Sequence, residues 1–192
     1  VMTIMTDETL SCLKPTRFID HNTSSVMDFA HRAIGKAKTD IDQAINLYYA
    51  VRDQIRYDPY SIVLEPGHLT ASATVRKGIG FCVTKSILMA AVARVARIPS
   101  RLGYANVRNH LTTERLRQKM KTDVFVFHGY TELLLDGRWI KTTPIFNLSL
   151  CERFGVKPLE FDGCHDSVFH EFDSEGNRHM EYLHDHGHFS DF

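Results

Sequence analysis

The sequence predicts one domain that combines helices with antiparallel strands. Residues 39–55 and 83–97 carry apolar side chains at helical spacing, and residues 123–144 have the pattern of a β-hairpin. A chain of 192 residues is long enough for one hydrophobic core and too short for two comfortable ones. We therefore expect a single domain over residues 1–192.

The first well-defined helix is expected to begin after Thr39. Thr39 is a good N-cap, acids fill the first turn, and apolar residues recur three or four apart until Pro59 prevents continuation. Upstream, "MDFAHRAIGKA" at 27–37 is a possible further helix. Residues 61–80 contain Pro, Gly and small polar residues without a long period, so we expect mostly loop with room for one short helical turn.

The segment 83–97 is expected to be the central helix of the core. Its apolar residues form a wide stripe, and Pro99 ends the pattern. Beyond it, "RLGYANV" at 101–107 predicts a strand. "TTERLRQKMK" at 112–121 predicts a short helix with little apolar surface, which is expected to be exposed.

A two-residue turn at Asp136-Gly137 is the strongest hairpin signal in the chain. It pairs Glu132 with Lys141, a favourable charge pair, and places Tyr130 opposite Thr143. His128 and Thr143 then lie diagonally on the more polar face. The other face is expected to be a core surface and collects Phe125, Phe127, Leu133, Leu135 and Ile140.

Composition excludes several classes of function. Twenty-three basic residues balance twenty-three acidic ones, so no overall field favours nucleic acid or an anionic membrane. The chain has no apolar run near the roughly 18 residues of a spanning helix, and no basic and apolar leader pattern, so we expect a soluble cytoplasmic protein. Its four cysteines show no CxxC spacing, which argues against a disulfide framework and a zinc knuckle.

Cys82 is placed where a thiol becomes reactive. It follows Gly78 and Gly80 and begins the predicted central helix, where unpaired N–H groups and the helix dipole favour the thiolate and can hydrogen-bond an oxyanion. The two glycines would let a substrate backbone approach. The alternative is a small buried hydrophobe at the start of a core helix.

A cysteine nucleophile also needs a histidine that the fold brings close. His128 interrupts the apolar strand "VFVFHGYTELLL", where a residue that merely fills the core would be Val or Phe. A strand histidine can equally be a satisfied core or edge residue. The register above favours the functional reading, because it gives His128 a hydrogen-bonding neighbour in Thr143.

These features together resemble the transglutaminase-like superfamily, a branch of the papain-like cysteine enzymes. The resemblance covers about 40–144 and includes "YDP" after the first helix, the glycine-flanked Cys82, "RVARIPSR" before a strand, and the His128 strand paired with "WIKTTP". It implies an α+β fold in which the Cys-bearing helix packs on an antiparallel sheet. It also implies Cys82 as nucleophile and His128 as general base and acid. The motif-bearing core is expected over about 40–147, with a C-terminal His-rich extension over about 148–192.

The third catalytic position departs from the family pattern. Thr143 stands where the family usually has Asp; it can accept a hydrogen bond from the imidazole but supplies no negative charge. Asn147 is a possible substitute, since papain-like enzymes can use Asn, and Asp162 is another; both can equally be turn residues. We expect Gly80, Phe81, Tyr130, Trp139 and Asp162 to line the cleft, although Trp139 can also be simply core.

Two further features are open to interpretation. A basic segment between the cysteine and histidine elements can be a lid that selects a carboxylate-bearing substrate, or a solvated face; its members are Arg108, Arg115, Arg117, Lys119 and Lys121. A histidine-rich tail can bind a transition metal, but its spacing defines no tetrahedral set, so we expect a solvated or loosely packed segment. The tail comprises His165, His170, His179, His184, His186 and His188.

The expected function is acyl transfer from an amide or peptide bond by a thiol enzyme. The resemblance favours hydrolysis by a protease or amidase over cross-linking by a transglutaminase. No cofactor or metal is expected, the expected partner is a peptide or amide substrate, and the oligomeric state is left open. The alternatives are a catalytically silent binding module of the same fold and a metal-binding protein that uses the histidine tail.

Overall fold

The computed structural model describes residues 6–110, 113–168 and 180–192. Its helices are α1 (Asp7–Ser11), α2 (Ser24–Ile34), α3 (Asp40–Gln54), the 3₁₀ turn η1 (Pro66–His68), α4 (Ala71–Lys77), α5 (Cys82–Val95), α6 (Glu114–Met120) and α7 (Leu148–Phe154). Its strands are β1 (Arg56–Tyr57), β2 (Ile79–Gly80), β3 (Ser100–Asn109), β4 (Val124–Leu135), β5 (Arg138–Thr142) and β6 (Met180–Phe189). The expected α+β class is confirmed.

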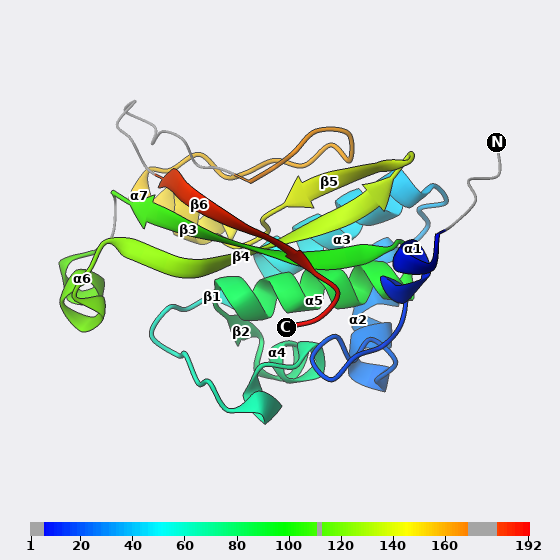
Figure 1. Cartoon of the computed structure of the whole chain (residues 1–192), viewed down its shortest axis with the longest axis horizontal. Coiled ribbons are helices and arrows are strands. Elements are labelled where there is room, and N and C mark those ends of the chain that lie inside the picture. Colours follow the sequence, from blue (N-terminus) through cyan, green and yellow to red (C-terminus); the bar gives the residue numbers. More distant parts are fainter. Residues whose placement is uncertain (1–5, 111–112, 169–179) are drawn as a thin grey trace.

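Helix α5 is the centre of the molecule, as its apolar sequence predicts. The sheet lies on one side of it in Figure 1, and α2 and α4 lie on the other. Every residue from Val83 to Arg94 is buried, so this helix is enclosed on all sides rather than amphipathic. The first residue of α5 is Cys82.

The main sheet has four antiparallel strands in the order β5-β4-β3-β6. Asp136 and Gly137 have φ values of 48° and 75°, which makes the predicted two-residue turn between β4 and β5. The predicted register is confirmed, since Glu132 pairs with Lys141 and Leu135 with Arg138. The turn chemistry therefore fixes which side chains share a face with His128.

The prediction of which β4 side chains face the core is only partly correct. Leu133 and Leu135 are buried against α5, but Phe127 is 54% exposed. Phe127 has φ of 56° and lies where the pairing of β3 with β4 shifts by one residue. Such a bulge interrupts the alternation of side chains, so the prediction of a buried Phe127 was wrong. Phe125 packs instead against a second apolar cluster that includes Tyr130.

Residues 180–192 are more ordered than the sequence indicates. We expected a solvated or loosely packed tail, but β6 pairs with β3 and completes the sheet at that edge. Aromatic residues anchor its end, because Phe189 and Phe192 both contact the ring of Tyr104. The sequence does not show a regular strand pattern here, because the register of β6 to β3 shifts twice.

The helices around α5 begin and end at identifiable residues. Thr39 caps α3 by accepting a hydrogen bond from the Asp42 N–H at 3.1 Å, as predicted. Within the segment expected to be mostly loop, Thr70 caps α4 and Gly78 ends it with φ of 63°. That segment therefore contains a full short helix that delivers the chain to β2 and α5.

A fully buried lysine on α5 joins it to α3. The Lys85 ammonium donates hydrogen bonds to the carbonyls of Arg52, at 2.9 Å, and Ile55, at 2.6 Å, at the C-terminal end of α3. Burial lowers the pKa of Lys85 to about 7, and the negative charge of Asp53 opposes that effect. Lys85 therefore satisfies carbonyls that the helix end would leave without donors.

We expect Lys85→Ala to lower the free energy of unfolding by about 3 kcal/mol or more, because it leaves a cavity and two buried carbonyls without donors. Urea denaturation followed by circular dichroism measures this loss. The exposed Lys36 provides the control, since Lys36→Ala should change stability by less than about 0.5 kcal/mol. Equal, small effects of both substitutions would contradict a structural role for Lys85.

Within the described ranges, no helix is both long enough and apolar enough to cross a membrane.

Candidate active site

Cys82 is held at the start of α5 by a short parallel pairing. Strands β1 and β2 join Tyr57 to Gly80, two residues before the cysteine. Thr84 completes the cap, because its hydroxyl accepts a hydrogen bond from the Phe81 N–H at 3.0 Å. This fixes the direction in which the chain enters the helix.

The first turn of α5 lies directly against β4. A Cβ atom on Gly129 would be 3.2 Å from the Cα of Val83 and 3.4 Å from the carbonyl oxygen of Cys82. A Cβ atom at this position would be in unusually close contact with the helix, so glycine suits this approach of strand to helix. The residue after His128 thus touches the turn that carries Cys82, although the two segments are far apart in the sequence.

The electrostatics of Cys82 differ from the sequence expectation. Burial raises the pKa of its thiol, while the backbone N–H groups of Gly129, Val83 and Cys82 itself act to lower it. The helix start therefore supplies the expected donors, but desolvation outweighs them. Burial therefore opposes the stabilisation of the thiolate that the helix start was expected to provide.

His128 is buried and its ring is unsatisfied. Its exposed fraction is 2%, and neither ring nitrogen has a hydrogen-bond partner among the described residues. Burial lowers the pKa of His128 to about 4, so the imidazole is neutral at physiological pH. A buried imidazole without partners costs free energy, because polar groups in the interior are normally paired, and such groups are found mainly at functional sites.

The low pKa of His128 predicts a loss of stability in acid. The unfolded chain binds this proton near pH 6.5 and the folded chain only near pH 4, so the free energy of unfolding falls as the pH drops between these values. At 1.36 kcal/mol per pH unit, the expected contribution is about 3 kcal/mol. Urea titrations of the wild type and His128→Gln at pH 7 and pH 4.5 measure it. The variant should lose less stability than the wild type, and parallel losses would contradict the assignment.

Thr143 lies just beyond the end of β5, where the register extends toward Tyr130 and His128. Its hydroxyl is buried and has no hydrogen-bond partner among the described residues. The neighbouring Thr142 is equally buried and unpaired, but it pairs with Thr131, whose hydroxyl donates to the Ser86 carbonyl on the α5 side of the sheet. Of the two threonines, Thr143 therefore shares a face with His128.

Asn147 and Asp162 make hydrogen bonds elsewhere. The Asn147 side chain accepts from the Tyr57 N–H at 3.0 Å and donates to Ser149 at 2.8 Å. The exposed Asp162 accepts from His165 at 2.7 Å, and this bond holds the pKa of its carboxyl below the usual range. Neither residue is hydrogen-bonded to His128, and Asp162 serves as a turn residue.

Three residues expected in the cleft have structural roles instead. Gly80 is buried, and a Cβ atom there would lie 2.7 Å from the Thr84 hydroxyl, so packing rather than substrate approach accounts for the glycine. The Phe81 side chain belongs to the main core. Tyr130 is also buried and donates to Asp185 of β6 at 3.0 Å.

Trp139 does not shield the site. Its ring packs under the Arg101 guanidinium at 4.0 Å, near the turn of the hairpin. It pairs with Leu134, which lies about 20 Å along β4 from His128 at the usual rise per residue. The ring therefore stabilises the hairpin at a distance from Cys82.

Two tyrosines beside Cys82 were not predicted as site residues. Tyr57 pairs with Gly80, two residues before Cys82, and Tyr104 pairs with Gly129, which contacts the first turn of α5. The Tyr104 hydroxyl is buried without a partner among the described residues. Tyr57 belongs to the "YDP" segment of the family resemblance, but nothing in the local pattern distinguishes Tyr104 from a core residue.

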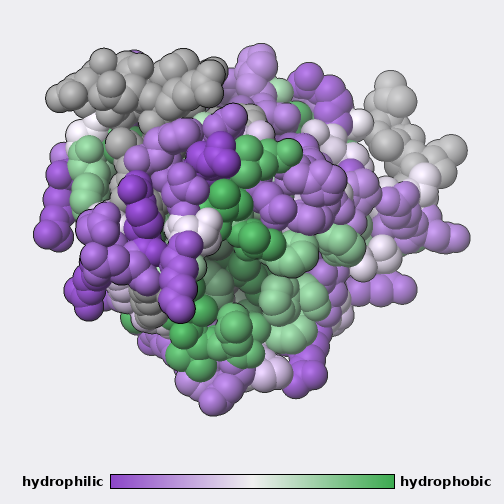
Figure 2. Space-filling view, turned by 60° about the vertical axis from the view of Figure 1, so that its left-hand side comes forward, coloured by the Kyte–Doolittle hydropathy of each residue, from purple (hydrophilic) through white to green (hydrophobic). Residues whose placement is uncertain are grey.

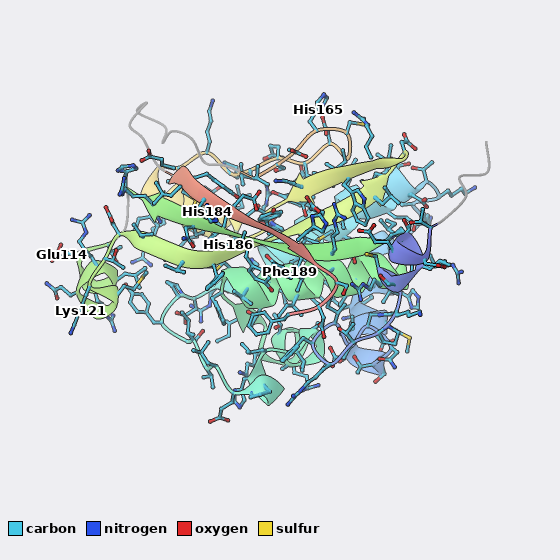
Figure 3. The ribbon with its side chains drawn as sticks, viewed as in Figure 1. Glu114, Lys121, His165, His184, His186 and Phe189 are labelled. Carbon is cyan, nitrogen blue, oxygen red and sulfur yellow. The ribbon has the colours of Figure 1, made fainter. Side chains whose placement is uncertain are left out.

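The described histidines do not converge on a metal site. Within the described ranges, no three His, Cys, Asp or Glu side chains are grouped to hold an ion. His184 and His186 lie together on β6, with ring centroids 4.6 Å apart, while Figure 3 shows His165 on a separate loop. His186 is hydrogen-bonded to Asn106 at 2.9 Å. His170 and His179 lie outside the described residues.

A buried helix that begins with Cys82 and packs on an antiparallel sheet is the core of a papain-like protein of the transglutaminase type. The chain belongs to the transglutaminase-like superfamily, which it matches over residues 27–144. No curated protein matches the sequence.

The solved structures that resemble the chain include two proteins described as putative proteases. One, from Cytophaga hutchinsonii, is described as a "putative cysteine protease"; it has a TM-score of 0.57 and 14% identity, over 96% of this chain and 55% of that one. This chain therefore spans about half the length of that structure. The other, from Parabacteroides distasonis, is described as a "putative protease", with a TM-score of 0.44 and 14% identity over 70% of this chain and 26% of that one. The first of these supports the fold.

Proposed function

We propose that the protein is a thiol-dependent acyl-transfer enzyme that acts on amide or peptide bonds, with hydrolysis as the main outcome. The observation that carries the proposal is the contact of Gly129, the residue after His128, with the first turn of α5. The contact is made by the backbone of β4, and the His128 ring forms no hydrogen bond with the Cys82 sulfur in this structure. The unpaired buried imidazole supports the proposal, because a neutral imidazole is the form that accepts a proton.

The reaction begins from a neutral thiol and a neutral imidazole. His128 takes the proton of the Cys82 thiol as the sulfur attacks the carbonyl carbon, and the carbonyl oxygen becomes an oxyanion. The N–H groups of Cys82 and Val83, at the start of α5, would donate hydrogen bonds to it, as helix-start N–H groups can. The C–N bond then breaks, His128 gives its proton to the leaving amine, and the acyl group remains on sulfur as a thioester.

The thioester is resolved by a second nucleophile. Water, deprotonated by His128, attacks the acyl carbon and releases a carboxylic acid and the free thiol. An amine in place of water would give a new amide, which is the transglutaminase outcome. A set of peptides, including glutamine-containing ones, incubated with and without a primary amine and analysed by mass spectrometry distinguishes the two. Hydrolysis products that dominate in the presence of amine support the proposal, and exclusive amine incorporation would contradict the hydrolase assignment.

A catalytically silent binding module is the second candidate. The raised pKa of Cys82, together with a His128 that lacks an orienting carboxylate among the described residues, favours this reading. The same assay decides between the two, because a silent module turns over none of the peptides.

We propose Thr143 as the residue that orients His128 when substrate is bound, since catalytic hydrogen bonds often form fully only in the complex. Thr143→Val should lower kcat about tenfold with little change in KM, because one neutral hydrogen bond is worth about 1.4 kcal/mol. Thr142→Val is the matched control, since the same hydroxyl is removed from a neighbouring buried site on the other face. Steady-state kinetics on both variants test this role of Thr143. Equal effects of the two substitutions on kcat would contradict it.

A further inference from the structure

A cavity of about 620 Å³ lies beside the candidate active site and has no assigned role. Tyr57 lines it, and Tyr57 pairs with Gly80, two residues before Cys82. Figure 2 brings the side of the molecule with α6 forward and shows apolar residues gathered around a hollow, with hydrophilic residues beside it. Cys82 itself does not line the cavity, so a group bound there would lie next to the segment that leads into the Cys82 helix.

Most of the cavity wall is apolar, and its residues come from α6, β4, α7 and the segments that flank α7. They are Leu116, Phe125, Phe146, Leu150, Phe154 and Val156. The Phe146 ring meets the Tyr57 ring edge-on with centroids 4.9 Å apart. Such a surface favours a bulky apolar side chain, because ligand pockets gain most of their affinity from buried apolar area.

The charges at the rim are mainly positive. Arg56, Arg115 and Arg153 line the cavity together with one acid, Asp58, which lies 3.8 Å from Arg56. Arg115 and Arg153 form no ion pair with any carboxylate in the described part of the chain. The Arg115 guanidinium stacks on the Tyr60 ring at 4.7 Å, an arrangement that leaves its N–H edge free to donate.

We propose that this cavity binds the substrate residues next to the scissile amide and selects a peptide in which a bulky apolar side chain is adjacent to a carboxylate. The apolar wall takes the side chain, and Arg115 and Arg153 donate hydrogen bonds to the carboxylate. The assignment of the bound group as substrate rests on the proposed function, since it takes Cys82 as the nucleophile.

The basic segment found in the sequence contributes to this site through one residue. Arg115 lines the cavity, whereas Arg108 pairs with Asp123 and Glu181. Arg117 and Lys121 are exposed and do not line the cavity, and Figure 3 shows Lys121 on the outer part of α6. The side chain of Lys119 lies outside the described residues. Selection of an acidic group therefore depends on Arg115 and Arg153 rather than on a general basic lid.

Binding is tested on Cys82→Ala, which has no thiol at this position and so reports affinity without turnover. The probes are three acetylated peptide amides that differ only in the residue after phenylalanine, which is glutamate, glutamine or lysine. Isothermal titration calorimetry should show the glutamate peptide binding about tenfold or more tighter than the glutamine peptide, as one or two charge-assisted hydrogen bonds predict. Arg115→Gln or Arg153→Gln, made in the same background, should reduce this preference.

The control is Arg117→Gln, which removes the same charge from α6 outside the cavity and should leave the preference unchanged. Arg115→Lys keeps the positive charge and should retain part of the preference for the glutamate peptide. Equal binding of the glutamate and glutamine peptides, preference for lysine, or no binding of any peptide would overturn the proposal. Turnover by the wild type without acid preference would overturn the cavity assignment alone. Acid-selective binding without turnover would overturn only the enzymatic function.

Discussion

Cys82→Ala is expected to abolish turnover, with a fall in kcat of about 10⁴-fold or more, because no other group at the start of α5 can form the thioester. The variant should keep its fold, since alanine leaves the first turn and its contact with Gly129 intact. Release of product from a quenched fluorescent peptide, followed by fluorescence, measures the loss. Circular dichroism and urea denaturation confirm that the variant is folded.

The matched control for this substitution is Cys164→Ala. Cys164 is partly exposed, as Cys82 is, but it lies on the loop that begins after α7. Its removal should leave kcat and KM within about twofold of the wild type, as expected for a site without a named structural role. Turnover by Cys82→Ala at the wild-type rate would show that the chemistry occurs elsewhere.

His128→Gln is expected to lower kcat by about 10³-fold, the range of a lost general acid and base. Glutamine fills a similar volume in the buried site but cannot carry the proton from the thiol to the leaving amine. The loss should be largest for substrates with a poor leaving group, because protonation of the amine is then the harder step. Kinetics on a matched anilide and activated ester measure this difference.

The control for His128 is His184→Gln on the exposed face of β6, which should have little effect on kcat. An equal loss of activity for the anilide and the activated ester in His128→Gln would contradict the role of His128 as general acid.

The parts of the fold that were predictable from sequence have strong local causes. The turn at Asp136-Gly137 requires positive φ at both residues, so these two residues determine the hairpin register without help from distant contacts. Thr39 is similarly a strong helix-start signal, and the continuous apolar sequence of α5 is compatible with few structures other than a buried helix. The confirmed register ends at the Thr131–Thr142 pair, and its extension by one residue places His128 and Thr143 on one face.

Other features depend on contacts between distant segments and leave no local pattern. The bulge at Phe127 breaks the expected alternation because β3 and β4 are out of step there, and β6 forms because β3 offers it an edge. The pKa of Cys82 depends on how deeply the first turn of α5 is buried under β4. The sequence around Cys82 carries no information about this burial. The role of Lys85 is also not visible in the local sequence, because its ammonium group reaches the carbonyls of α3 only in the folded chain.

Trapping of an acyl-enzyme tests the central claim most directly. The wild type is mixed with an activated peptide ester, quenched in acid within milliseconds to seconds, digested and analysed by mass spectrometry. The account predicts a thioester on Cys82 that forms much more slowly in His128→Gln and is absent in Cys82→Ala. An adduct on Cys12, Cys151 or Cys164 instead, or formation on Cys82 at the same rate without His128, would contradict it.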